Sequence, residues 1–487
     1  MSPARTNQLE PVKAAQYAMS ADCQELLTGE KLSICSPAMR PDAKMEIPAE
    51  LLKFANALHC DSFERSVRYF FPDANLTALG AAPEFGPSLT LLNRTDNGTL
   101  EMEWMGTHYH IERVRRSFTE HDLRLLAAIG RVLSSRYQSI PFAGSAAAGP
   151  YLFEGLVEDR HVSAFLDPSP YMGKGELPAK RDVVAETIEV LRQSSLITYE
   201  SHRISTGVIL ISQGRDARDA KPELPLGAVP YTSALVSIKS FHRLCDGLHT
   251  VFLVNPEGML VDLVDVERYV REYGDVLLPT PRPERYRAHC LATASGGNIC
   301  LVLTPNGEIK IFAGGVQVFH FLEGRWRVSD MQEKYNEFHQ AIGDTVLASR
   351  LFTVALNLAE HRRGGLFVVL EQEQSALTLV VPEDLVENQE PDSCKKLHYL
   401  LRQKSVIELE STVLQSIAGI DGGIVMDRFG RLLAYGAILR TAGEPVAAQE
   451  GGRSTAAVYA SKFGLALKIS EDGIVSFYRG GAKIWEI

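Results

Sequence analysis

The sequence predicts an α/β protein in which mixed sheets are flanked by helices and a smaller α+β domain comes first. Three observations lead to this fold class. The continuous apolar run FVVL (367–370) is typical of a strand buried on both faces. Segment 346–362 repeats apolar residues with helical spacing. Two distant stretches also resemble each other, which indicates a duplicated unit of helices and strands.

The composition limits the class of protein and its partners. With 487 residues the chain is too long for one ordinary core, so about three domains are expected. A net charge of −10 argues against non-specific nucleic-acid binding, because no overall cationic field attracts phosphates. No apolar run approaches the length of a membrane span. Seven cysteines without a C-x-x-C pair favour a reducing compartment, so we expect a cytoplasmic protein without nucleic-acid or membrane partners.

The first expected domain covers residues 1–140 and ends at a linker rich in small residues, PFAGSAAAGP (141–150). Segments 90–95 and 99–114 are predicted strands around an Asp-Asn-Gly turn at 96–98. Segment 118–137 is a predicted helix with Thr119 as its N-cap and Asp122 three residues later. This strand-rich segment closed by a helix resembles the end of a GAF-type sensor domain, so a sensor-like α+β domain is expected.

The remainder of the chain contains two similar segments. Residues 287–318 align without a gap on residues 453–484, with seven identities. CDGLHTVFLVNPEGMLVDL (245–263) matches the stretch that begins at Asp421, and helices lead into both GVILIS (207–212) and GLFVVLE (365–371). Chance similarity of strand–turn–strand patterns is the alternative. Three pieces in the same order favour a true duplication, with domains at 151–335 and 340–487.

The first stretch of chemical interest in the second copy is DGGIVMDRFGRLLAYG (421–436). The two glycines allow positive φ and close approach of a ligand to the backbone. Asp421 before such a strand could hold a divalent cation or orient a hydroxyl nucleophile. The alternative is an aspartate that caps a turn, since Asp-Gly is a common turn pair.

Two further stretches carry polar groups of the same kind. In EGGRSTAAVYASKFG (450–464), a helix start with one guanidinium and two hydroxyls could cradle a phosphate. The alternative is a helix N-cap by Ser454 or Thr455, with Arg453 in solvent. In KISEDGIVSFYRGG (468–481), a hairpin turn places Glu471 at a strand end, where it could complete a metal site with Asp421. A solvent-facing hairpin residue is the alternative.

The order of these three stretches is more specific than any one of them, and it resembles the diadenylate cyclase (DAC) domain of the DisA family. That family carries Asp-Gly-Ala, then Gly-Thr-Arg-His-Arg-Ala-Ala, then a Ser-Glu strand end. This chain has Asp-Gly-Gly, Gly-Gly-Arg-Ser-Thr-Ala-Ala and Ser470-Glu471. The resemblance covers about residues 345–487, and residues 180–320 more weakly.

The resemblance implies condensation of two ATP into cyclic di-AMP, with release of two pyrophosphates and with Mg²⁺ or Mn²⁺ as cofactor. Asp421 would bind the metal or help to activate the 3′ hydroxyl, and Glu471 would assist in holding the metal. Arg453 would hold the phosphates, and Asp421, Arg453 and Glu471 would be the catalytic residues. The remaining nucleotide-binding residues would be Gly422, Gly423, Tyr435, Gly436 and Ala437 around the adenosine, and Gly451, Gly452, Ser454, Thr455 and Ser470 around the phosphates.

The departures from the family's pattern favour a second hypothesis. Where the family has Arg-His-Arg, this chain has Arg453-Ser454-Thr455, and hydroxyls cannot supply the bidentate bonds of a guanidinium. A catalytically impaired module that binds ATP or cyclic di-AMP is therefore the alternative to an enzyme. An α/β scaffold without any nucleotide is a third possibility.

The first copy departs further. Leu248-His249 follow its Asp246-Gly247, and Pro305 stands where the second copy has Glu471, so this copy is predicted to be non-catalytic. The resemblance also implies two facing sites, each presenting one ATP. The second face would come either from the first copy, as an intramolecular pseudo-dimer, or from a homodimer.

Overall fold

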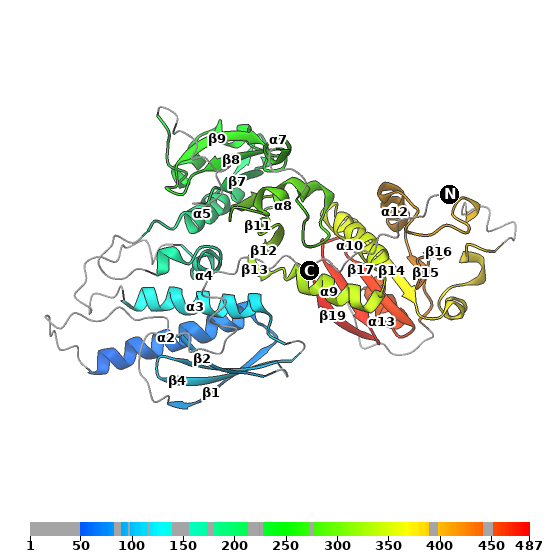
Figure 1. The fold of residues 1–487 in the computed structure, drawn as a ribbon, viewed down its shortest axis with the longest axis horizontal. Coiled ribbons are helices and arrows are strands. Elements are labelled where there is room, and N and C mark those ends of the chain that lie inside the picture. Colours follow the sequence, from blue (N-terminus) through cyan, green and yellow to red (C-terminus); the bar gives the residue numbers. More distant parts are fainter. Residues whose placement is uncertain are drawn as a thin grey trace, which may run out of the picture. The chain divides into compact units, whose positions relative to one another are not determined.

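The computed structural model of the chain describes residues 49–81, 89–95, 98–114, 117–138, 155–172, 180–212, 224, 227–271, 276–388, 398–441 and 451–487. The chain divides into two compact units, Met1–Lys180 and Arg181–Ile487, each considered by itself below (Figure 1). The predicted linker at 141–150 lies outside the described residues. Among the described helices, none has both the length and the apolar character that crossing a bilayer requires.

The first unit is an antiparallel sheet with helices. Its strands are β1 (Ala74–Ala81), β2 (Leu89–Arg94), β3 (Thr99–Trp104) and β4 (Thr107–Arg113), in the order β1-β4-β3-β2. Its helices are α2 (Ala49–Phe70), α3 (Glu120–Gln138), α4 (Val157–Leu166) and the 3-10 turn η3 (Ser169–Tyr171). The predicted strand 99–114 is in fact a hairpin, because Met105 and Gly106 adopt positive φ and turn the chain.

The predicted helix start in this unit is confirmed. The amide of Asp122 donates to Thr119 Oγ1 at 3.1 Å, and the amide of Thr119 donates to Asp122 Oδ2 at 2.9 Å. This reciprocal pair is a capping box. Helix α4 packs on α3, where the Arg124 guanidinium lies 4.4 Å from the Phe165 ring centroid. The sequence-based boundary had assigned this helix to the domain that begins at 151.

The second unit contains two sheets, which we call the first lobe (residues 181–328) and the second lobe (residues 331–487). The first-lobe sheet has the order β13-β12-β11-β10-β7-β8-β9. Its strands are β7 (Thr206–Leu210), β8 (Thr250–Val254), β9 (Leu260–Asp265), β10 (Ile299–Leu303), β11 (Ile309–Ala313), β12 (Val316–Leu322) and β13 (Arg325–Val328). Other first-lobe elements are α5 (Val183–Ser195), β5 (Thr198–Tyr199), β6 (His202–Arg203), η4 (Ser233–Ser237), α6 (Phe241–Leu244), α7 (Val266–Arg271), η5 (Glu284–Tyr286) and α8 (Arg287–Thr293).

The second-lobe sheet has the order β16-β15-β14-β17-β18-β19. Its strands are β14 (Gly365–Leu370), β15 (Gly423–Asp427), β16 (Leu432–Ala437), β17 (Gly464–Ile469), β18 (Val475–Arg479) and β19 (Ala482–Glu486). Its longer helices are α9 (Met331–Ile342), α10 (Thr345–Glu360), α12 (Ser411–Ala418) and α13 (Gly452–Ala460). Short helical turns are η6 (Glu373–Ser375), α11 (Ala376–Leu379), η7 (Pro382–Asp384) and η9 (His398–Leu400).

The two lobes share one topology. In each, a central strand pairs in parallel with one neighbour (β7 with β8, β14 with β15) and antiparallel with the other (β10, β17). The ungapped alignment of 287–318 on 453–484 places Ile309–Ala313 of β11 on Val475–Arg479 of β18, and α8 on α13. Matching strand order, strand direction and helix position support the duplication, with β13 as an addition in the first lobe.

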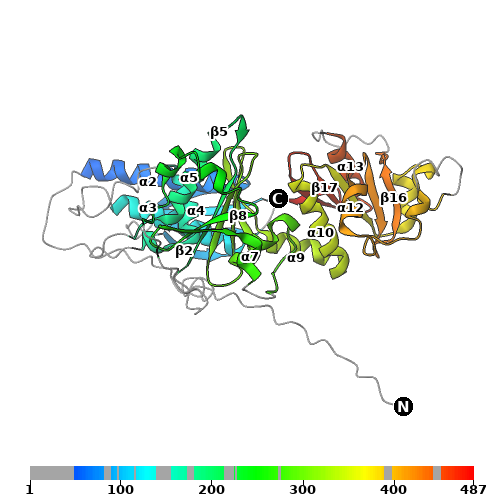
Figure 2. The same ribbon diagram turned by 90° about the horizontal axis from the view of Figure 1, so that it is seen from above.

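The core of the second lobe lies on both faces of β14. Phe367 and Val369 belong to the apolar cluster under α10, and Leu366 and Val368 belong to the cluster under α13. All six residues of β14 are buried, which confirms the strand buried on both faces. Helices α10 and α13 thus flank this sheet, and both are visible beside its strands in Figure 2. The observed class is mixed α/β with helix-flanked sheets.

Candidate functional site

Three segments of the second lobe meet at the guanidinium of Arg453. Its Nη2 lies 3.4 Å from Asp421 Oδ1, and its Nη1 lies 3.0 Å from Glu471 Oε1. Asp421 precedes β15, Arg453 lies in the first turn of α13, and Glu471 follows β17. The structure therefore brings together the three residues that the sequence singled out as catalytic.

The topology explains why these residues meet. Strand β15 runs parallel to β14, so both begin at the same edge of the sheet. Strand β17 runs antiparallel to β14 and ends at that edge. The residues that precede β15 and follow β17 consequently flank the start of β14, and α13 begins above it.

Gly364, just before β14, makes room for the guanidinium. A Cβ built at this position would lie 2.1 Å from Arg453 Nη1 and 2.7 Å from Arg453 Cζ. Any other residue would therefore push the guanidinium away from the two carboxylates. The sequence analysis missed this residue, although the Gly-Gly pair before a buried strand was a visible signal.

The two carboxylates face solvent. The side chain of Asp421 is 96% exposed and that of Glu471 is 72% exposed, whereas that of Arg453 is 30% exposed. Exposed ion pairs of this kind contribute little to stability, about 0–1 kcal/mol. The three groups can therefore exchange their mutual contacts for a bound cation or phosphate at small cost.

We call residues 419–423, between α12 and the start of β15, the Asp421 loop, and its glycines Gly422 and Gly423 have different roles. Gly422 has a φ of +112°, and a Cβ there would lie 2.5 Å from the carbonyl carbon of Gly436. Close packing against β16 therefore requires this glycine, a reason that the sequence did not indicate. A Cβ at Gly423 would lie 3.5 Å from Leu366 Cδ2, an ordinary contact, so the alanine of the family's Asp-Gly-Ala would fit here.

The structure buries Tyr435, which the resemblance had placed beside the adenosine. Its side chain is only 7% exposed, and its ring centroid lies 5.1 Å from that of His398. Of the predicted adenosine-bordering residues in β16, only the backbone of Gly436 and Ala437 lies near the Asp421 loop. Apolar side chains in and beside this loop were missed by the sequence analysis: Ile420 is 47% exposed and Ile438 is 69% exposed.

Helix α13 begins with a different N-cap from the one that the sequence suggested. Gly451 is the N-cap, with a φ of +91° and no side-chain cap bond, so the alternative of a cap by Ser454 or Thr455 is wrong. A Cβ at Gly451 or Gly452 would meet no described atom within 4 Å, and both residues are exposed. Ser454 is 5% exposed, and the Thr455 hydroxyl donates to the Gly451 carbonyl at 3.3 Å.

Ser470 serves the hairpin turn. Its hydroxyl donates to Asp472 Oδ1 and to the carbonyl of Ile474, the latter at 3.1 Å. The amide of Gly473 closes the turn on the Ser470 carbonyl at 3.1 Å. This hydroxyl therefore holds the turn that carries Glu471.

In the first lobe, the residue equivalent to Asp421 is Asp246, and its carboxylate accepts hydrogen bonds within its own turn. Asp246 Oδ1 accepts from the amides of Leu248, His249 and Thr250 at 2.8–2.9 Å. Its Oδ2 lies 2.8 Å from His249 Nδ1. Burial raises the pKa of Asp246, but these hydrogen bonds outweigh burial and lower the pKa to about 2. The structure records no ion pair between this aspartate and Arg287, the residue that corresponds to Arg453.

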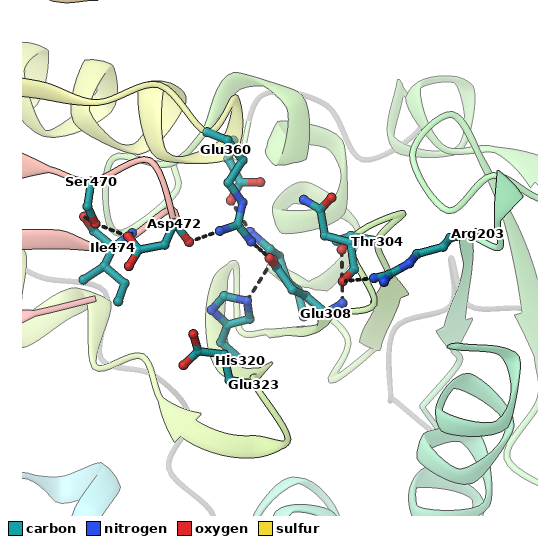
Figure 3. A network of polar contacts seen from close by, with 12 residues as sticks. Arg203, Thr304, Glu308, His320, Glu323, Glu360, Ser470, Asp472 and Ile474 are labelled. Atoms are coloured by element: carbon teal, nitrogen blue, oxygen red, sulfur yellow. Dashed lines mark hydrogen bonds and ion pairs between the residues drawn. The ribbon is translucent and has the colours of Figure 1, made fainter. Parts of the chain in front are cut away.

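A network of charges joins the two lobes beside the candidate site (Figure 3). Arg362, at the end of α10, forms an ion pair with Glu308 of the first lobe and donates to the Asp472 carbonyl. Glu308 Oε2 also lies 3.1 Å from His320 Nε2, and Lys310 pairs with Glu360. A cavity of about 240 Å³ lies among these groups. Because Asp472 follows Glu471, this network supports the turn that carries Glu471.

Comparisons with known proteins give only remote similarities. No family model and no curated protein matches the chain. A hypothetical membrane spanning protein from Bacillus cereus is 22% identical, with 32% of this chain and 70% of that chain covered and a TM-score of 0.25. A double mutant of DacA from Staphylococcus aureus is 16% identical, with 30% of this chain and 87% of that chain covered and a TM-score of 0.21. Both TM-scores are low, and neither similarity establishes an activity for this chain.

Proposed function

We propose that the second lobe is a diadenylate cyclase-like nucleotidyltransferase that condenses two ATP into cyclic di-AMP. The observation that carries the proposal is the position of Arg453 between Asp421 and Glu471 at one edge of the sheet. Two exposed carboxylates, one guanidinium and the exposed first residues of α13 lie in a single site, and phosphoryl transfer requires groups of these kinds.

The donor set suits a hard divalent cation. Mg²⁺ and Mn²⁺ prefer carboxylate oxygens, and Asp421 and Glu471 present such oxygens from opposite sides of one guanidinium. When bound, the cation supplies charge neutralisation at the triphosphate. Arg453 would then contact phosphate oxygens in place of the carboxylates, because a guanidinium bonds both kinds of group bidentately.

The protein's own contribution is to position the reacting groups. In each half of the reaction, the 3′ oxygen of one nucleotide bonds to the α-phosphorus of the other, pyrophosphate leaves and the hydroxyl loses its proton. Asp421, the more exposed of the two carboxylates, would accept that proton. The amides at Gly451 and Gly452 would hold phosphate oxygens, and Ile420 and Ile438 would contact the base.

The second candidate function is a nucleotide-binding module without catalysis. Two residues favour it: Ser454 is buried, and the Thr455 hydroxyl donates to the Gly451 carbonyl of its own helix. Neither supplies the phosphate contacts of the histidine and arginine in the family's pattern. Loss of a transition-state donor lowers a rate by about 10²-fold or more. The proposed enzyme is therefore expected to be slow.

The test is incubation of the full-length protein with ATP and Mn²⁺, followed by chromatography for cyclic di-AMP. We expect slow product formation that Asp421→Asn abolishes. Equal product from both proteins would mean a contaminating enzyme, and the proposal would fail. Retained ATP binding without product would favour the binding module, and absence of both would leave only a scaffold.

A further inference from the structure

A second polar cavity lies between the lobes, formed by segment 278–287 of the first lobe and by helices α9 and α10. Its volume is about 310 Å³, within the range of small-molecule sites. Leu278, Pro279 and Pro281 form an apolar wall. Thr280, Tyr335, Ser349 and Thr353 add hydroxyls, and Arg282 and Arg287 add two guanidiniums.

The lining of this cavity carries more positive than negative charge, with two arginines and one glutamate. Within the described part of the chain, neither Arg282 nor Arg287 forms an ion pair; Arg282 Nη1 donates to the Thr280 carbonyl at 3.0 Å. Glu284 is the one carboxylate in the lining, and its Oε1 accepts from the Ser411 hydroxyl of α12 at 2.9 Å. Burial lowers the pKa of Arg282, and the nearby Arg287 charge lowers it further.

The duplication explains how Arg287 lost its partners. Arg287 corresponds to Arg453, which is neutralised by Asp421 and Glu471. In the first lobe, the equivalent of Glu471 is Pro305, and the equivalent aspartate, Asp246, is bonded within its own turn. The first lobe therefore has the arginine, but one of the two carboxylates is absent and the other is bonded within its turn, and the guanidinium lines a cavity instead.

We propose that this cavity binds a small molecule carrying a dianionic phosphate group, with the phosphate held by Arg282 and Arg287. Two guanidiniums suit a dianion, because each can donate two parallel bonds to phosphate oxygens. The hydroxyls of Ser349 and Thr353 can donate further bonds, and the proline-rich wall accepts the remainder of the ligand. The inference does not rest on the proposed function, since none of these residues belongs to the site at Arg453.

Because the segment and the two helices belong to different lobes, a ligand here would contact both. The lobes already meet at this place, where the amide of Glu284 donates to Asn357 Oδ1 of α10 at 2.8 Å. The bound phosphate would therefore strengthen the junction of the lobes.

The first test is chemical protection of the full-length protein. Phenylglyoxal, which modifies accessible arginines, is applied with and without inorganic phosphate at constant ionic strength, and modified positions are mapped by mass spectrometry. Arg287 is exposed and should react; phosphate should slow its modification several-fold while leaving exposed Arg268 of α7 unaffected. Equal rates at Arg287 with and without phosphate would overturn the proposal.

The second test uses variants and isothermal titration with glycerol phosphate as the probe. Arg287→Gln should weaken binding by about ten-fold or more, a loss of about 1.4 kcal/mol, and Arg287→Lys by less. Arg268→Gln is the matched control and should bind as the parent protein does. If Arg453→Gln removes binding while Arg287→Gln does not, the probe occupies the other site and the proposal is wrong. Because Arg287 is exposed, its substitution should leave the unfolding midpoint unchanged.

Discussion

At the residue scale, Arg453 depends on Gly364 for its position. Alanine at 364 would bring a Cβ within 2.1 Å of Arg453 Nη1, and the flexible guanidinium would have to move. We expect Gly364→Ala to weaken ATP·Mn²⁺ binding by about ten-fold or more, with a change in unfolding free energy within about 1 kcal/mol. Isothermal titration and urea unfolding give the two quantities.

Two neighbouring glycines supply matched controls for this prediction. Gly423→Ala places a Cβ at ordinary contact distance and should change neither quantity. Gly422→Ala meets backbone atoms at positive φ and should destabilise the fold by about 1–3 kcal/mol. Weaker binding in all three variants would point to a general loss of fold and contradict a specific role for Gly364.

Buried histidines make stability depend on pH. His289 is fully buried, and its Nε2 lies 2.9 Å from the Gly247 carbonyl. Burial lowers the pKa of His289 to about 4. Between pH 6.5 and pH 4 the unfolded chain therefore binds a proton that the folded chain does not, and stability falls as the pH falls.

The expected contribution of His289 to this loss is about 3 kcal/mol across the interval. His289→Gln keeps a donor for the Gly247 carbonyl and removes the titration, so urea unfolding should show a flatter pH dependence. The exposed His202→Gln is the control and should retain the dependence of the parent protein. An unchanged pH profile for His289→Gln would contradict this explanation.

At the element scale, the end of α10 and strand β11 are held together by buried charge. Lys310 pairs with Glu360, and their side chains are 6% and 11% exposed. Glu360→Gln leaves the ammonium of Lys310 buried without its partner, which costs about 3–5 kcal/mol. Urea unfolding measures this loss. Glu323→Gln, which removes an exposed pair with Arg327, should cost less than about 1 kcal/mol, and equal losses would refute the interpretation.

The elements themselves were largely predictable from the sequence. Apolar runs such as 367–370 and the Thr119–Asp122 cap are local signals, and both appear in the structure as expected. The hairpin at Met105 and Gly106 and the cap at Gly451 were missed, because each depends on positive φ at one or two residues inside a longer pattern. The spacing of apolar and polar residues does not specify which residue adopts positive φ.

The site was predictable only in part for a similar reason. Asp421, Arg453 and Glu471 were identified by motif order, and the strand directions bring them together. The burial of Tyr435 and Ser454 was not predicted, because side-chain direction depends on packing from distant helices. The exposure of Ile420 and Ile438, and the contact of Gly364 with Arg453, follow only from the assembled sheet, although the Gly-Gly pair at 364–365 was a signal in the sequence.

At the scale of the whole molecule, the two lobes have one topology but different chemistry. The second lobe has a guanidinium between two exposed carboxylates. In the first lobe, the equivalent aspartate, Asp246, accepts hydrogen bonds within its own turn. The first lobe therefore offers no equivalent second site, and we expect two chains to combine for the proposed condensation. Specific activity should rise with chain concentration. A concentration-independent rate from a monomer would instead support an intramolecular pseudo-dimer.

The central claim is that Asp421, Arg453 and Glu471 form one nucleotide and cation site. Titration of ATP with Mn²⁺ into the parent protein, Asp421→Asn, Glu471→Gln and the double variant tests it most directly. We predict losses of about ten-fold or more for each single variant, and a double loss smaller than their product, since both carboxylates serve one cation. Undiminished affinity in both single variants would contradict the claim.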